Sequence, residues 1–234
     1  MTRPKSVPGE KPLFWTGSSK DDLLAFPEAV IDEIGTALSV AQFGGKHPSA
    51  KPWRGEGPGV FEVVEDHRGD TYRAVYTVKF EKAVYVLHAF QKKSPSGIKT
   101  ARKDAELIGR RLVMLGPTMR CDMQKGRVKS EVISSSGNVF ADLGVTNAEE
   151  KQTKVRLAVT INQIIQGRKL TQMAAARRLN VNQPKVSALS NYQLDGFSVE
   201  RLMNFLTALD RDVDIIIRRA PRSRKGGRIL VTAA

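Results

Sequence analysis

The chain has 234 residues, enough for one large domain or for two small ones with separate cores. It carries 38 Lys and Arg against 24 Asp and Glu, a formal net charge of +14, which favours a polyanionic partner. Cys121 is the only cysteine and the three histidines are scattered, so we expect no disulfide, metal or other cofactor. No run approaches 18 apolar residues, so we expect a cytoplasmic protein without a membrane partner.

The pattern of apolar and turn-forming residues in the first half predicts an α+β domain with a small antiparallel sheet and helices. Residues 21–42 show a helical pattern of apolar residues interrupted at Pro27, which indicates one amphipathic helix or two. Turn-forming segments separate three strands that predict an antiparallel meander, at residues 60–65, 71–79 and 83–90. A further helix is expected at about residues 98–115.

The sequence predicts a junction after residue 118. Met119 and Met123 follow it directly, and either residue is compatible with a former start codon, as if two adjacent genes were read as one. We therefore predict a first domain over residues 1–118, a linker and docking arm over 119–150, and a second domain over 151–234. The apolar residues expected to dock the arm are Val139, Phe140 and Leu143.

The second domain is predicted to be all-α, with a helix-turn-helix at residues 170–189. Thr171 can cap the first helix, and Asn180 falls at the tight turn, where one residue must adopt a left-handed conformation. Pro184 suits the first turn of the second helix. A helix near residues 151–166 precedes the motif. Further features of the pattern are a small Ala176, inward-facing Val186 and Leu189, and a following helix capped by Ser198.

This motif gives the chain a candidate partner, operator DNA, because the start of its second helix enters the major groove. Gln183 can make paired hydrogen bonds to adenine, worth about 1–3 kcal/mol of discrimination, and Gln172 can hold a phosphate. Residues 119–234 carry a net charge of +10 against +4 for residues 1–118, which argues against the alternative of an ordinary helical hairpin. The candidate DNA-contacting residues are Gln172, Asn182, Gln183, Lys185 and Ser187.

The end of the chain has two further features. Val213, Ile215 and Ile217 alternate with other residues and predict a closing strand that pairs across a homodimer or is covered in another way. Residues 218–228 contain six Lys and Arg and no acidic residue. This tail is either an arm that binds phosphates or a solvated segment without a partner.

In the first domain, a predicted strand ends in a basic cluster. Alternation places His88, Phe90 and Lys92 on one face, where an imidazole, a ring and a cation would suit single-stranded RNA. In the preceding strand, Arg73 and Tyr76 point to opposite faces unless a bulge intervenes. Two purely structural alternatives to RNA binding remain. His88 can be a core histidine, and Lys92 and Lys93 can belong to a solvated turn. Trp53 and Arg54 either line the same groove or cover the core.

These segments resemble known families. Residues 72–76, 86–94 and the helix around Ala101-Arg102 resemble the phage-derived HigB-type toxins of the RelE superfamily. Residues 123–234 resemble the HigA-type antitoxins of the XRE helix-turn-helix family. The segments that carry the second resemblance are residues 136–144, 182–189 and 196–202.

The resemblance implies a RelE-like mRNA endonuclease that acts on the ribosome and is neutralised by an antitoxin domain, which also represses its operon. Cleavage in such enzymes is attack of the ribose 2′-hydroxyl on the adjacent phosphate, assisted by basic side chains rather than a metal. The resemblance places phosphate binding on Arg73 and Lys92, assistance on Lys93 or Lys99, and proton transfer on His88.

Two other readings remain open. In one, the chain is a non-enzymatic transcription regulator whose first domain only senses or dimerises. In the other, two normally separate proteins have been concatenated artificially. The expected partners are operator DNA, mRNA on the ribosome, the chain's own toxin or antitoxin domain in cis or in trans, and a second copy in a homodimer.

Overall fold

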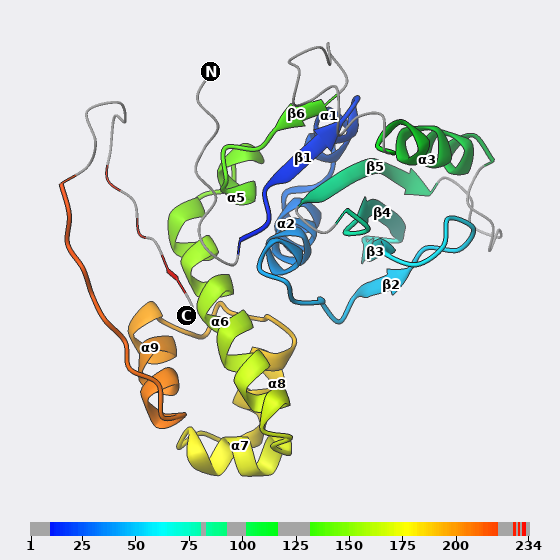
Figure 1. The fold of residues 1–234 in the computed structure, drawn as a ribbon. Coiled ribbons are helices and arrows are strands. Elements are labelled where there is room, and N and C mark those ends of the chain that lie inside the picture. Colours follow the sequence, from blue (N-terminus) through cyan, green and yellow to red (C-terminus); the bar gives the residue numbers. More distant parts are fainter. Residues whose placement is uncertain are drawn as a thin grey trace. The chain divides into compact units, whose positions relative to one another are not determined.

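The computed structural model describes residues 10–80, 83–92, 102–116 and 132–219, together with Gly227, Ile229, Val231 and Thr232. The described chain divides into two compact units, one from Glu10 to Val145 and the other from Thr146 onward. Figure 1 shows the elements of both units. Among the described helices, none has the length and apolar character needed to cross a bilayer.

The first unit is built on a sheet whose described strands follow the order β2-β3-β4-β5-β1-β6. Neighbouring strands are antiparallel except β1, which runs parallel to β5. The predicted meander is confirmed, whereas three short strands escaped prediction because they have too few residues to show a period. The strands are β1 (Leu13–Thr16), β2 (Ala50–Pro52), β3 (Val60–His67), β4 (Asp70–Thr77), β5 (Val84–Lys92) and β6 (Val132–Ser134).

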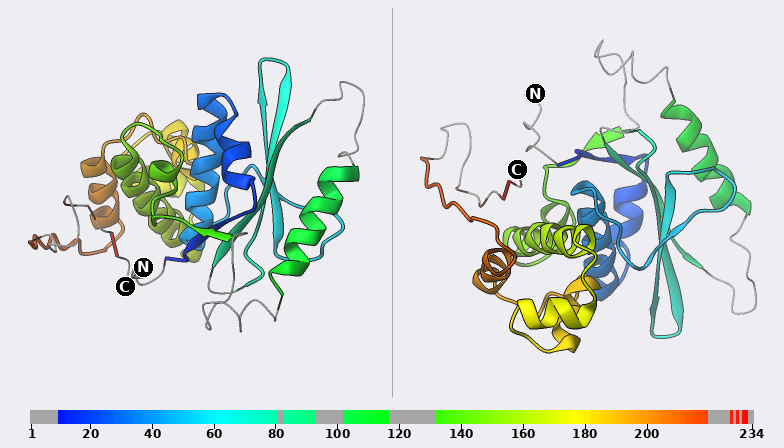
Figure 2. Two further views of the ribbon diagram at one scale, coloured as in Figure 1. Left: turned by 90° about the horizontal axis from the view of Figure 1, so that it is seen from above. Right: turned by 60° about the horizontal axis from the view of Figure 1, so that its bottom comes forward.

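Helices cover both faces of this sheet. Pro27 has extended backbone angles and separates α1 (Ser19–Leu24) from α2 (Glu28–Gln42), so the first apolar pattern forms two helices. Figure 2 shows α2 on one face and α3 (Arg102–Met114) on the other. Residues 98–101, where α3 was expected to begin, lie outside the described residues. The α3 face has its own apolar cluster, which includes Val75, Phe90, Ile108 and Leu112.

Residues 132–145, here called the arm, complete the first unit. β6 pairs antiparallel with β1, with Phe14 opposite Ser134. The short helix α5 (Val139–Asp142) is capped by Asn138, whose side chain accepts hydrogen bonds from two backbone amides. Its Phe140 is fully buried. A Cβ on Gly35 of α2 would lie 3.4 Å from side-chain atoms of Phe140 and Leu143, so the arm packs closely against α2 at this glycine.

The second unit is helical in its described part, as predicted. It contains α6 (Ala148–Gly167), α7 (Gln172–Arg178), α8 (Gln183–Ser190) and α9 (Val199–Ala208). The Asn162 amide of α6 donates to the Leu189 carbonyl of α8 at 3.0 Å, which satisfies a buried carbonyl in the core. Ser198 caps α9 as expected, because its hydroxyl accepts from the Arg201 amide at 3.2 Å.

The predicted closing strand is not formed in the single chain. Residues 211–219 have no regular secondary structure, and the side chains of Ile215, Ile216 and Ile217 are 73%, 68% and 94% exposed. The alternation of apolar residues supplies one face of a strand. A strand also needs a neighbouring backbone to bond with, and no described segment of this chain supplies one.

Candidate nucleic-acid interfaces

The helix-turn-helix of α7 and α8 has the geometry that its sequence predicts. The Thr171 hydroxyl accepts from the Ala174 amide at 3.2 Å, and the Asn182 side chain accepts from the Lys185 amide at 3.1 Å. Both helices therefore begin with a satisfied cap. Asn180 takes the left-handed conformation, with φ of 52°, at the turn between them.

The two glutamines meet at the exposed surface of the motif. Gln183 Nε2 donates to Gln172 Oε1 at 3.2 Å, which joins the first turns of α7 and α8. This bond leaves Gln183 one amide hydrogen and its carbonyl oxygen, the donor and acceptor that a bidentate contact with adenine needs. Gln172 keeps its NH2 group, which can donate to a phosphate.

The other predicted DNA-contacting residues have different surroundings. Lys185 Nζ lies 3.3 Å from the Gly196 carbonyl and 5.0 Å from the centre of the Phe197 ring, so its cation is held by the loop before α9. The Asn182 oxygen is engaged in the cap, and Ser187 is half-buried on α8. The geometry thus brings Gln172 and Gln183 together and turns Lys185 toward the protein.

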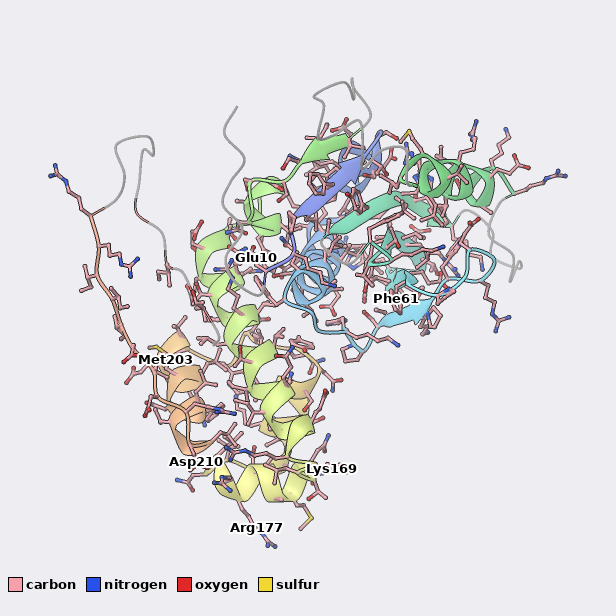
Figure 3. The ribbon with its side chains drawn as sticks, viewed as in Figure 1. Glu10, Phe61, Lys169, Arg177, Met203 and Asp210 are labelled. Atoms are coloured by element: carbon pink, nitrogen blue, oxygen red, sulfur yellow. The ribbon has the colours of Figure 1, made fainter. Side chains whose placement is uncertain are left out.

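A hollow beside Gln183 was missed by sequence reasoning. It has a volume of about 430 Å³, and the side chain of Met173 at its rim is 58% exposed. Arg177, one turn further along α7, points away from the ribbon (Figure 3). The available signal was an apolar Met173 four residues before Arg177 on the exposed face. The hollow is lined by Met173, Ala176, Arg177, Asn180, Val181, Asn182 and Gln183.

The second candidate surface lies on the sheet of the first unit. Arg73 is directly opposite Phe90, and Lys92 and His88 occupy the positions two residues to either side of Phe90 on β5. Directly opposite residues share a face, so the structure gathers all four on the face that α3 covers. A register shift between Val75 and the next residue of β4 accommodates a bulge in β5.

Carboxylates already hold two of these groups. Arg73 Nη1 donates to Glu62 Oε2 at 2.6 Å. His88 lies between two helices, with Nε2 3.3 Å from Asp104 Oδ1 of α3 and Nδ1 3.4 Å from Asp22 Oδ2 of α1. Its ring stacks on Phe90 with centroids 5.2 Å apart. Arg73 and His88 therefore each lie close to carboxylates of the same unit.

The remaining predicted residues are divided between the core, the surface and the segments that are not described. Trp53 is 8% exposed and packs in the α3 cluster, so it forms part of the core instead of lining a groove. Arg54 is exposed in the adjacent loop, and Lys92 is half-buried. Lys93 and Lys99 lie outside the described residues. In the described ranges, no group of three or more His, Cys, Asp or Glu is placed to hold a metal.

Comparison with known proteins distinguishes the two halves. Residues 139–218 match a family described as a helix-turn-helix domain. A solved structure, provisionally titled an XRE-family transcriptional regulator, is 62% identical over 38% of this chain and 99% of its own, with a TM-score of 0.37. This region is an XRE-type helix-turn-helix domain. As such it is a DNA-binding domain.

The first half matches a different family. Residues 21–113 match the phage-derived Gp49-like proteins. A comparison with curated proteins gave no match. The helix-turn-helix match begins at Val139, so it includes α5, which packs in the Gp49-like unit. Residues of the DNA-binding family therefore complete the core of the other unit.

Proposed function

We propose that the chain is a toxin–antitoxin module in one polypeptide. Its helix-turn-helix domain binds operator DNA and represses transcription, as HigA-type antitoxins do. Its Gp49-like unit is a HigB-type toxin of the RelE superfamily, a metal-independent endonuclease that cleaves mRNA on the ribosome. The observation that carries the proposal is the arm, because α5 belongs to the helix-turn-helix match and is buried against α2 of the Gp49-like unit.

On DNA, α8 enters the major groove with its first turn toward the bases. Gln183 pairs with an adenine through its amide, while Gln172 orients Gln183 and donates to a phosphate. Arg177 at the rim of the hollow adds a cation near the DNA backbone. The chain binds as a homodimer, so that two copies of α8 read two half-sites.

On RNA, the reaction adds negative charge to the phosphate as the 2′-hydroxyl attacks, and protons must leave one oxygen and reach another. Arg73 and Lys92 hold the phosphate once Glu62 is displaced. His88 transfers the proton, with its two ring nitrogens oriented by Asp22 and Asp104. Lys93 and Lys99 remain candidates for additional charge stabilisation.

The arm controls this site from a distance. It adds β6 to the free edge of β1, and α1 begins three residues after β1 ends. Helix α1 carries Asp22, one of the two carboxylates beside His88. With β1 held between β5 and β6, the charge-paired arrangement around His88 is stabilised. Loss of the arm frees the outer edge of β1 and loosens that arrangement.

Substituting Gly35 tests the proposal in the full-length chain. Gly35→Leu overfills the space occupied by Phe140 and Leu143 and should displace the arm, whereas Ala29→Leu adds the same side chain at an exposed position of α2. We expect growth arrest and cleaved ribosome-bound mRNA for Gly35→Leu only. Adding Arg73→Ala and Lys92→Ala should restore growth.

The control for arm displacement is amide hydrogen exchange in β6 and α5, which should accelerate in Gly35→Leu alone. Accelerated exchange without growth arrest would contradict the toxin proposal. Residues 1–118 expressed alone give a second comparison, since they lack the arm altogether. Equal growth with this fragment and with the full chain would count against autoinhibition.

The charge pairing supports a second candidate function. Arg73 is paired with Glu62, and His88 lies between Asp22 and Asp104 of the same unit, as expected if the unit had lost its RNA chemistry. The chain would then be a non-enzymatic regulator whose first unit senses a signal or dimerises. This alternative predicts normal growth for Gly35→Leu and no effect of Arg73→Ala.

A further inference from the structure

The hollow beside Gln183 is lined in part by apolar side chains. Met173, Ala176 and Val181 contribute them, and the side chain of Met173 is 58% exposed. Helix α7 begins at Gln172, so Met173 directly follows the residue that accepts the hydrogen bond of Gln183. An exposed methionine therefore lies beside the pair of glutamines that we propose acts on the operator.

A cation belongs to the same hollow. Arg177 follows Met173 by four residues, a spacing that places two side chains on one face of a helix with Cβ atoms about 5–6 Å apart. The next residue, Arg178, is bonded to Asp210, whereas Arg177 has no salt bridge within the part of the chain that the structure describes. The hollow thus combines an apolar contact with an available positive charge.

The size and the lining of the hollow fit one kind of nucleotide. Its volume of about 430 Å³ lies in the range of about 300–1,000 Å³ that is typical of small-ligand sites, so it can hold more than the edge of one base. In the major groove only thymine presents an apolar group, its 5-methyl. Guanine, cytosine and adenine would bury hydrogen-bonding groups against the methionine without partners, which costs free energy.

We propose that the hollow receives a thymidine nucleotide of the operator, with its 5-methyl group against Met173 and its phosphate at Arg177. The thymine lies within about one base step of the adenine read by Gln183, because Gln183 also lines the hollow. Met173 is then a specificity-determining residue, whose flexible thioether adapts to the methyl group. The inference rests on the operator binding proposed above and adds the identity of a second base.

Replacing thymine by uracil tests the methyl contact directly, because this change removes only the methyl group and keeps the base pair. The probe is an operator selected from a random DNA library, with uracil introduced at one position of a half-site at a time. The full-length chain should lose about fourfold in affinity at one position. That position should lie next to the adenine whose replacement no longer matters in Gln183→Ala.

Substitution of Met173 shows whether this residue makes the contact. Met173→Ala should bind the thymine operator about fourfold more weakly and should no longer distinguish thymine from uracil, whereas Met173→Leu should keep the preference. Removing the side chain and the methyl group separately and together isolates their interaction. Because Met173 is exposed, Met173→Ala should keep the melting temperature of the unaltered chain.

Met203→Ala is the matched control for Met173→Ala. Met203 lies on α9, away from α7, and is not part of the hollow (Figure 3). The same side chain is removed, but the full preference for thymine over uracil should remain.

Substitution of Arg177 tests the phosphate contact. Arg177→Gln should weaken binding to all DNA sequences and lower the slope of log K against log salt by about one for each copy bound. The preference for thymine over uracil should be unchanged, since the methyl contact is kept. An unchanged salt slope would show that no phosphate lies at Arg177.

Two further outcomes would overturn the inference while leaving operator binding intact. One is equal affinity for thymine and uracil at every position of the operator. The other is an undiminished preference for thymine in Met173→Ala, which would place the methyl group against another side chain. Failure of the chain to bind any DNA sequence selectively would instead overturn the proposed operator binding, and the inference with it.

Discussion

The two candidate nucleic-acid surfaces of this chain differ in how accessible their polar side chains are. On α7 and α8 the glutamine side chains are exposed and already oriented by their mutual hydrogen bond. On the sheet, Arg73 is paired with Glu62, and His88 lies between Asp22 of α1 and Asp104 of α3. The DNA-binding surface is thus accessible in the fold as it stands, whereas the RNA chemistry that we propose would need the sheet surface to open. This contrast is expected of a repressor joined to a silenced toxin.

The largest expected effect concerns the arm that completes the closed unit. Phe140→Ala should lower the free energy of unfolding of the first unit by about 3–5 kcal/mol, because it removes a fully buried ring between α5 and α2. Denaturant unfolding followed by the near-ultraviolet signal of Trp15 and Trp53 measures it. Val113→Ala, at an exposed position of α3, should change it by less than about 0.5 kcal/mol. A similar loss in the free energy of unfolding for Phe140→Ala and Val113→Ala would show that the arm is not part of the core.

On the DNA-binding surface, we expect substitution of Gln183 to lower the sequence specificity of DNA binding. Gln183→Ala should cost about 1–3 kcal/mol in binding to the preferred operator and almost nothing on unrelated DNA, because only base readout is lost. Selection from a random DNA library followed by anisotropy titrations measures both quantities. Gln172→Ala is the matched comparison and should weaken binding to all sequences. If Gln183→Ala weakened binding equally on all DNA sequences, Gln183 would contact the DNA phosphate backbone instead of a base.

The cap of α8 separates stability from recognition. Asn182→Ala should destabilise the second unit by about 1 kcal/mol, since the Lys185 amide loses its acceptor. Asn182→Asp keeps that acceptor and should preserve the melting temperature while weakening DNA binding through repulsion of phosphates. Thermal unfolding and anisotropy on the same samples distinguish the effects. Equal destabilisation by Asn182→Ala and Asn182→Asp would show that the hydrogen bond of the cap does not stabilise α8.

A smaller effect is expected at Lys185. Lys185→Met should cost about 0.5–1 kcal/mol of stability, because the cation leaves the Phe197 ring and the Gly196 carbonyl. The salt dependence of DNA binding should stay unchanged, since no phosphate contact is lost. If the slope of log K against log salt fell by about one, Lys185 would be a phosphate ligand after all.

A further expected effect is a pH dependence confined to the first unit. Burial, helped by Glu33 and Asp66, raises the pKa of Glu65 from 4.5 to about 7. The folded state therefore binds this proton more tightly than the unfolded state. Its contribution to stability is complete below pH 4.5 and is lost as the pH rises through about 7. Glu65→Gln should flatten the melting temperature between pH 5 and 8, and an unchanged slope would exclude Glu65 as its source.

The sequence predicted what depends on neighbouring residues. Caps at Thr171 and Asn182, the left-handed Asn180 and the break at Pro27 all follow from residues a few positions apart. The meander on β3, β4 and β5 was predictable because each strand is long enough to show alternation. The placement of His88, Phe90 and Lys92 on one face followed from the same period, whereas the position of Arg73 opposite Phe90 depends on the register between two strands.

What escaped prediction depends on contacts distant in sequence. The target of the arm is set by β1 and by the space above Gly35, more than a hundred residues earlier. The carboxylates around His88 come from α1 and α3, and Lys185 is turned away by a ring twelve residues later. The missing strand at residues 213–217 needs a neighbouring strand that no described segment of the chain supplies.

The most direct test of the central claim is cleavage of mRNA on purified ribosomes by the purified full-length chain. We expect no cleavage by the unaltered protein or by Ala29→Leu, and clear cleavage by Gly35→Leu that disappears when Arg73→Ala and Lys92→Ala are added. Cleavage by the unaltered protein would show that the arm does not silence the unit. Absence of cleavage by Gly35→Leu, with the arm demonstrably displaced, would show that there is no nuclease to silence.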